Sequence, residues 1–226
     1  QGRPALKGGK PKVVVIPRSR QLDGFFKNLA ARADKIRSGG VPPEQDNMLK
    51  IVMEGCLATL HPALVGIQPK AGEKTKIDYI AEEVAKRYAS GRGVRYKNPE
   101  GDDESIPGSS QAIFSDLGVP KAAGEFSVYE AIRKSLVKRG LPAAANAFVH
   151  DVPIHRKEEL LGKVRSGEVP VISGSTGMLG TGSNIQKRLA AVHHADVPWR
   201  PMDYIQRNGR IDRQGNQNAE VEIVYY

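Results

Sequence analysis

The sequence has few of the features that mark secreted, membrane-spanning or disulfide-rich proteins. Cys56 is the only cysteine, so an internal disulfide is excluded, and this fits a reducing compartment. No apolar run approaches the roughly 20 residues that a membrane-spanning helix needs, and there is no signal peptide, internal repeat or heptad pattern. Because the chain begins at Gln1 and not at methionine, we expect it to be a piece of a longer polypeptide.

The sequence also lacks every complete fingerprint of a phosphate site. Lys74-Thr75 follows Gly72-Glu73, which is not the Gly-x-x-x-x-Gly-Lys-Ser/Thr spacing of a phosphate-cradling loop. The acidic run Asp102-Asp103-Glu104-Ser105 follows a polar loop and not a buried strand, so we do not assign it to magnesium. Neither a Gly-x-Gly-x-x-Gly after a first strand nor a nucleophile elbow is present. These absences disfavour a self-sufficient nucleotide or sugar-phosphate enzyme.

Length and composition indicate a globular protein with an uneven charge. The 226 residues are 39% apolar and 26% charged, which suits one large domain or one domain with an appendage. The net charge of +9 is concentrated in residues 1–50, where eleven Lys and Arg stand against four Asp and Glu. Such a basic segment is what a nucleic-acid backbone attracts, and it is equally typical of a solubilising surface.

The first 110 residues are predicted to be largely helical. Glycines in the first ten residues indicate a flexible lead-in, and Val13 to Ile16 indicate a short buried strand. Apolar residues at helical spacing predict helices over 21–37, 47–65 and 72–89. The polar stretch 90–108, rich in Gly, Pro and acid, is predicted to be a loop.

From residue 111 onward, apolar strand patterns alternate with amphipathic helix patterns. Strands are predicted over 111–117, 145–149, 169–173, 189–194 and 219–225, and helices over 127–139, 155–166 and from Pro201 onward. This alternation predicts an α/β fold in which a parallel sheet is covered by helices on both faces. Ligands of such sheets bind at the carboxyl ends of the strands.

Two polar segments lie where such a ligand would bind. The strand 169–173 runs into a loop with Gly174, Gly177, Gly180 and Gly182. The helix from Pro201 carries Gln206, Arg210 and Arg213 at positions i, i+4 and i+7, so we expect all three on one face before a stop at Gly215. Two guanidinium groups and a carboxamide on one face suit phosphate oxygens, although a solvated helix face has the same pattern.

Both segments resemble motifs of the superfamily-two helicases. Gly180, Gly182 and Asn184 match the Gly-x-Gly-x-Asn of motif V in the Swi/Snf-like branch, and Asp196 and Trp199-Arg200-Pro201 match its next conserved positions. Gln206, Gly209, Arg210 and Arg213 match the Gln-x-x-Gly-Arg-x-x-Arg of motif VI. The phrases GEV-x-V-x-x-GST, HH-x-D-x-PWRP and RQGN are similar to the helicase part of phage and conjugative-element methylase-helicase proteins, over roughly Asp46 to the C-terminus.

The resemblance implies a C-terminal RecA-like lobe of a two-lobed motor. Residues 1–70 would be a basic bridging segment, a strand plus helices, from the missing first lobe, and 71–226 the helicase C-terminal domain. The whole would be an ATP-dependent DNA helicase or translocase of a bacterial or phage cytoplasm, and this lobe would be inactive alone. ATP and Mg²⁺ would be held mainly by the first lobe. The implied partners are DNA, that first lobe and a methylase domain.

The resemblance also assigns roles to single residues. Arg213 would be the arginine finger, Arg210 a second γ-phosphate contact, and Gln206 the group that orients water or nucleotide. The implied ATP-binding residues are Gly180, Gly182, Asn184, Gly209, Arg210 and Arg213, and the implied nucleic-acid-binding residues are Ser175, Thr176, Thr181, Ser183 and Trp199. Met178-Leu179 departs from the small residues usual in that loop, and Asp212 is placed to form a local ion pair with Arg213.

Other interpretations remain open at this stage. A nucleic-acid-binding module without motor activity would share the basic segment, but it has no use for an arginine finger. His193 and His194 are adjacent in a strand and must point to opposite faces, so we expect buried side chains and not a metal pair. Trp199 either stacks on a base or packs to fix the helix start at Pro201.

Overall fold

The core of the protein is a parallel β-sheet. The computed structural model describes residues 2–119, 124–179 and 182–226. Strand β3 (Ser110–Phe114) lies at the centre, between β5 (Val171–Gly174) and β6 (Leu189–His194). The outer positions are taken by β4 (Asn146–Phe148) beside β5 and by β7 (Glu220–Tyr225) beside β6. All of these pairs are parallel, as the alternating pattern predicted.

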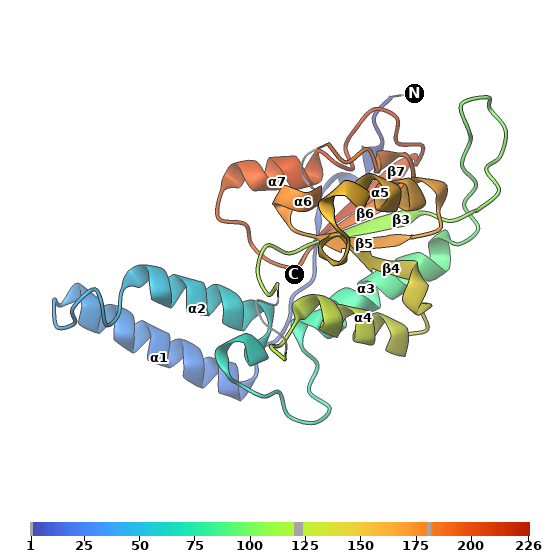
Figure 1. Cartoon of the computed structure of the whole chain (residues 1–226). Helices are drawn as coiled ribbons and strands as arrows, with labels where there is room; N and C mark the ends of the chain where they lie inside the picture. The colour runs from blue at the N-terminus through green and yellow to red at the C-terminus, as the bar shows by residue number, and fades with distance from the viewer. Residues whose placement is uncertain (1, 120–123, 180–181) are drawn as a thin grey trace.

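Helices cover both faces of this sheet (Figure 1). On one face lie α3 (Lys76–Gly91) and α4 (Val128–Lys138), whose apolar residues pack with Ile113 and Val171. On the other face, α5 (Lys157–Ser166) and the short α6 (Thr176–Leu179) pack with Phe114 and Ile172. Neighbouring strand residues thus point into two different cores, which explains why the strands are nearly continuous apolar runs. The predicted three-layer α/β fold is confirmed.

Helices α1 (Arg20–Arg37) and α2 (Met48–Leu60) form a hairpin that projects away from the sheet (Figure 1). Both begin at side-chain caps, because Ser19 accepts from the Leu22 amide and Asn47 from the Lys50 amide. Inside the hairpin, the Arg32 guanidinium bridges the carboxylates of Asp46 and Glu54. A short 3₁₀ helix, η2 (Pro62–Val65), leads from α2 back to the sheet. Leu60, the last residue of α2, is fully buried.

The N-terminal segment differs from the prediction. The expected flexible lead-in contains β1 (Ala5–Leu6), a 3₁₀ turn η1 (Lys7–Gly9) and β2 (Lys12–Val13), and both strands pair with β7 at the edge of the sheet. The buried strand predicted over Val13 to Ile16 is wrong, since β2 ends at Val13, and Val13 and Val15 are 66% and 83% exposed. A two-residue edge strand has little covering on its outer face, so its apolar side chains stay in solvent.

The polar loop 90–108 is tied to the sheet by a buried cation. Arg188, just before β6, is fully buried and donates to the Ile106 and Gly108 carbonyls at 2.6 and 3.1 Å. It also forms an ion pair with Glu104, and its guanidinium lies 4.9 Å from the Tyr96 ring centre. Glu104 of the acidic run is therefore engaged in holding this loop.

No helix within the described ranges is both long enough and apolar enough to cross a membrane.

Candidate functional site

A buried polar network joins the carboxyl ends of three neighbouring strands. Asp116 follows β3, Thr176 follows β5 and Asp196 follows β6. Arg207, from α7 (Pro201–Asn208), is fully buried and binds all three. Its Nη2 donates to Asp116 Oδ2 at 2.7 Å and to Asp196 Oδ1 at 2.9 Å, and its Nε donates to Thr176 Oγ1 at 2.7 Å.

The two carboxylates are also held by hydrogen bonds from the strand ends. Asp116 accepts from the Thr176 amide at 2.6 Å and from the Thr176 hydroxyl at 2.8 Å. Asp196 accepts from the amides of Asp116 and Leu117 at 2.5 and 2.9 Å. Burial by itself would raise the pKa of Asp116, but the Thr176 amide and the Arg207 charge outweigh it and hold this pKa below its usual value. The network is therefore charged, and it fixes α7 against the sheet.

Sequence analysis missed both Arg207 and Asp116. Arg207 occupies one of the unspecified positions of the motif VI pattern, and Asp116 lies outside the recognised motifs. One signal was available: Asp116 and Asp196 each follow an apolar strand, and parallel strands bring such ends together. Two carboxylates at one buried edge require a cation, and Arg207 is the one that the fold supplies.

The prediction of one helical face for Gln206, Arg210 and Arg213 is wrong. Helix α7 ends at Asn208, so Gln206 is exposed on its last turn while both arginines lie beyond it. Beyond this end, Ile211 is fully buried in the core cluster that also contains Val221 and Ile223 of β7. The Asn208 side chain also reaches inward, 2.8 Å from His194 Nε2.

Beyond the helix end, two guanidinium groups lie near each other. Arg213 is exposed and Arg210 is half-buried. Burial lowers the pKa of Arg210, and the nearby charge of Arg213 lowers it further. Asp212 does not form the expected ion pair with Arg213 in the part of the chain that the structure describes, and its carboxylate lies 4.0 Å from Arg3. Two close cations suit an anion with several oxygens.

The predicted glycine loop is partly helical. Helix α6 begins at Thr176, directly after Ser175, whose amide lies 3.4 Å from His150 Nε2. Gly174 permits this arrangement, since an added Cβ there would lie 2.9 Å from Leu179 Cγ. Gly180 and Thr181 lie outside the described residues.

The rest of the predicted loop divides into exposed and buried groups. Gly182 has a left-handed backbone, with φ 70°, and is exposed, as is Asn184. The Ser183 side chain is buried and its hydroxyl donates to the Leu179 carbonyl. The hydroxyls of Thr176 and Ser183 therefore face the protein, while Gly182 and Asn184 face solvent.

The segment that carries most of the buried Arg207 network and the two exposed glycine-loop residues matches a known protein family. Residues 128–215 match a family described as the helicase conserved C-terminal domain. This segment of the chain is therefore similar to helicase C-terminal domains. The matched segment runs from the start of α4 to Gly215. It therefore includes Thr176, Asp196 and Arg207 of the buried network, and also Arg210 and Arg213 beyond the end of α7.

A relative from Escherichia phage P1, Defense against restriction protein B, is 32% identical to the chain over 69 residues. That stretch covers 30% of this chain and 3% of the phage protein, so the chain spans only a small part of this relative.

Several solved structures are similar to the chain. The C-terminal part of the Fun30 ATPase domain has a TM-score of 0.49 at 16% identity, over 76% of this chain and 48% of that one. The DUF1998 helicase MrfA bound to DNA has a TM-score of 0.46 at 13% identity, over 70% of this chain and 19% of that one. A variant of S. cerevisiae Dbp5, bound to a Gle1 variant and IP6, has a TM-score of 0.44 at 18% identity, over 67% and 32%.

Several apolar side chains around the start of α7 are exposed. Trp199 is 54% exposed, so the structure disfavours the interpretation that it packs to fix Pro201. Met202 and Ile205 of α7 are 58% and 65% exposed, and Val197 before them is 63% exposed. Trp199 therefore remains available for a contact outside the domain.

Both histidines of β6 are buried, and they point to opposite sides as predicted. His193 hydrogen-bonds with Gln111 Oε1 at 2.9 Å and with the Tyr226 hydroxyl at 2.7 Å. His194 bonds with Asn208 and lies against the Tyr225 ring at 4.7 Å. Burial lowers the pKa of His194 to about 4 and that of His193 well below its ordinary value. These residues connect the sheet to α7 and to the C-terminus.

These histidines predict that acid destabilises the domain. His61 is also buried, which lowers its pKa to about 4, and its Nδ1 accepts from the Ala63 amide. The unfolded chain takes up protons below a pH of about 6.5 while the folded chain does not, so the free energy of unfolding should fall from neutral pH towards pH 4 by about 1.4 kcal/mol per pH unit for each histidine. Urea unfolding at a series of pH values measures this slope.

The His61→Gln variant provides the control for this pH effect. It removes one titrating group, so its slope between pH 5 and 6 should be flatter by about 1.4 kcal/mol per pH unit. Above a pH of about 7.5 the histidines are neutral in both states, and the two curves should run parallel. Parallel curves over the whole range would contradict the assignment of His61.

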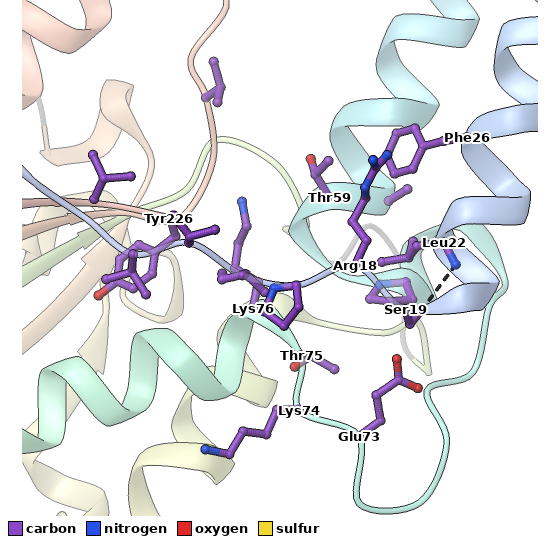
Figure 2. Close-up of a pocket in the computed structure, with 18 residues that line it drawn as sticks. Arg18, Ser19, Leu22, Phe26, Thr59, Glu73, Lys74, Thr75, Lys76 and Tyr226 are labelled. Carbon is purple, nitrogen blue, oxygen red and sulfur yellow. Dashed lines mark hydrogen bonds between the residues drawn. The ribbon is translucent and has the colours of Figure 1, made fainter.

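A pocket of about 380 Å³ lies apart from these groups (Figure 2). It forms where segment 13–19 passes between the α1–α2 hairpin and the start of α3, and Tyr226 closes one side. Lys76 lines it and donates to the Ala195 carbonyl at 3.2 Å, and burial lowers the pKa of Lys76. Gln206, Arg210 and Arg213 are not among its lining residues. Within the described ranges, no group of three or more His, Cys, Asp or Glu side chains is arranged to hold a metal ion.

Proposed function

We propose that this chain is the second motor lobe of an ATP-dependent DNA helicase or translocase. In this proposal Arg213 is the arginine finger, Arg210 contacts the γ-phosphate, and Gln206 orients water or nucleotide. The observation that carries the proposal is the buried Arg207 network, which fixes α7 so that Arg210 and Arg213 leave its end close together. Guanidinium groups placed in this way suit the charge that develops on a transferred phosphoryl group.

The residues present fit one part of a nucleotide site. The two guanidinium groups and the backbone amide at Gly182 can bind phosphate oxygens, whereas the Gly209 amide already donates to the Ile205 carbonyl at 2.8 Å. ATP would supply the phosphoanhydride bond that is hydrolysed. The carboxylates at this edge, Asp116 and Asp196, are committed to Arg207, so we assign Mg²⁺ to the first lobe. The first lobe would also supply the phosphate-cradling loop that this sequence lacks.

The proposal divides the chain into two parts. Residues 1–70 are the bridging segment from the first lobe, with the α1–α2 hairpin and two edge strands, and residues 71–226 are the motor domain. Within the motor domain, Ser175, Thr181 and Trp199 contact nucleic acid in this proposal, whereas the hydroxyls of Thr176 and Ser183 are buried and do not. The proposal also includes a methylase domain in the same polypeptide. That part rests only on the short sequence motifs that resemble phage and conjugative-element methylase-helicase proteins.

ATP hydrolysis by this chain alone, with and without DNA, is the test. A half motor lacks the phosphate loop, so we expect no turnover above that of an Arg213→Ala variant in either condition. DNA-stimulated turnover that the Arg213 substitution abolishes would contradict the half-motor proposal and favour a self-sufficient enzyme. DNA binding without any turnover, even when a first lobe is supplied, would favour a nucleic-acid-binding module.

A further inference from the structure

Part of the basic excess of the N-terminal segment is used in ion pairs between this segment and the rest of the domain. Lys12 binds Glu83 at 2.6 Å, Lys7 lies 3.6 Å from Glu222, and Arg3 lies near Asp212. These pairs join edge strands β1 and β2 and the turn between them to α3 and β7. Cations used in this way are unavailable to a partner, so an interaction surface must be sought among the remaining basic residues.

Three of the remaining cations lie on one exposed face of helix α1. Arg20, Lys27 and Lys35 are exposed and lie within about 80° of one another around the helix axis, given 3.6 residues per turn. We call these three residues the basic stripe. No acidic side chain in the described part of the chain forms an ion pair with them. Gly24 and Ala31 lie between them, and nothing lies within 4 Å of a Cβ added at Gly24.

Four acidic residues of the hairpin pair with other cations. Asp46 and Glu54 bind Arg32 on the inner side of α1, between the two helices. Asp23 and Asp34 lie on the same side of α1 as Lys27 by helical spacing, and there they pair with Arg18 at 3.5 Å and with Arg37 at 3.6 Å. The three cations of the stripe therefore keep their charge on this face.

We propose that the basic stripe of α1 binds the phosphate backbone of double-stranded DNA. From Arg20 to Lys35 the stripe spans about 22 Å, a length over which a DNA duplex carries about 13 phosphate charges. The hairpin that carries the stripe projects away from the sheet (Figure 1). The choice of DNA rests on the proposed function.

The composition of the stripe favours a duplex over a single strand. Single-stranded nucleic acid is usually bound by aromatic side chains that stack on its unpaired bases. The aromatic residues of α1, Phe25 and Phe26, are turned towards α2 and pack in the hairpin core with Leu29 and Ile51. The stripe offers cations and small side chains only, which suits contacts to a regular backbone.

The test compares two variants that lose the same charge. Arg20→Gln, Lys27→Gln and Lys35→Gln together remove the stripe, and Lys134→Gln, Lys138→Gln and Lys157→Gln remove three cations from α4 and α5. Binding of a fluorescent duplex of about 20 base pairs is followed by anisotropy at salt concentrations from about 50 to 200 mM, without nucleotide. A single-stranded oligonucleotide of the same length is the second probe.

We expect the stripe variant to bind the duplex at least tenfold more weakly at about 100 mM salt, and the slope of log K against log salt to fall by about 2–3. The affinity of the α4–α5 variant for the duplex should stay within about twofold of that of the unaltered chain. The stripe variant should lose less affinity for the single-stranded oligonucleotide than for the duplex. Equal losses in the two variants, or an equal loss on both probes, would overturn the proposal. Absence of duplex binding by the unaltered chain would also overturn it and favour an acidic protein as the occupant.

This experiment separates the inference from the proposed function. It contains no ATP, so failure of the half-motor proposal leaves its outcome unchanged. A motor with a working arginine finger could equally track DNA through the loop around α6 alone, in which case only the stripe proposal fails.

Discussion

Replacing Arg207 with methionine is expected to lower the free energy of unfolding by about 3–5 kcal/mol. Arg207 is fully buried between Asp116 and Asp196, at 2.7 and 2.9 Å. Methionine fills similar space but leaves two carboxylates with no buried cation, and uncompensated buried charges are costly. Urea unfolding at neutral pH measures the loss.

Two further variants make this prediction specific. Arg95→Met removes an exposed arginine of the loop 90–108 and should change stability by less than about 0.5 kcal/mol. Arg207→Met combined with Asp116→Asn and Asp196→Asn removes the charges together and should be more stable than Arg207→Met alone. A loss below about 1 kcal/mol for Arg207→Met would mean that the network is not held by this guanidinium.

Replacing Arg213 with alanine is expected to lower kcat for ATP hydrolysis by about 10³–10⁵-fold once a first lobe is present. Arg213 is exposed beyond the end of α7, so its loss should leave the melting temperature of the domain unchanged. Its proposed contact is made in the transition state, so kcat should fall far more than KM rises. Steady-state hydrolysis by the two-lobed motor, with DNA at saturation, measures both constants.

The lysine variant gives the sharpest control for this prediction. Arg213→Lys keeps the charge but removes the planar fork that binds two oxygens, so it should restore little of the lost rate. Arg95→Ala removes an exposed arginine that has no proposed role and should leave kcat within about twofold. A rate for Arg213→Ala within tenfold of the unaltered motor would exclude Arg213 as the finger and leave Arg210 as the candidate.

Most elements of the sheet could be predicted from local patterns. Strand β6 occupies the predicted residues 189–194, and helix α4 begins one residue after Ser127, whose side chain caps it as expected. Apolar runs between turn residues specify strands that are buried on both faces, and a capping residue followed by an amphipathic pattern specifies a helix. The edge strands β1 and β2 escaped prediction because two residues carry no periodicity.

The end of α7 shows where local patterns fail. The spacing of Gln206, Arg210 and Arg213 is helical, and nothing in the segment itself forbids a longer helix. The chain turns after Asn208, and Ile211 is buried in the core cluster with Val221 and Ile223 of β7. That burial is a property of the packed sheet, so a pattern read along one segment does not contain it.

By itself, the sequence determined the order of strands and helices, the parallel sheet, and the motifs that indicate a helicase lobe. Only the tertiary structure decided which arginines of residues 200–213 are buried and which face solvent. Arg207 is buried because the fold brings to it Asp116, which is 91 residues away in the chain, and the carboxylate of Asp196. Helical spacing is a local property, whereas the burial of a charge depends on partners that only the assembled strands bring together.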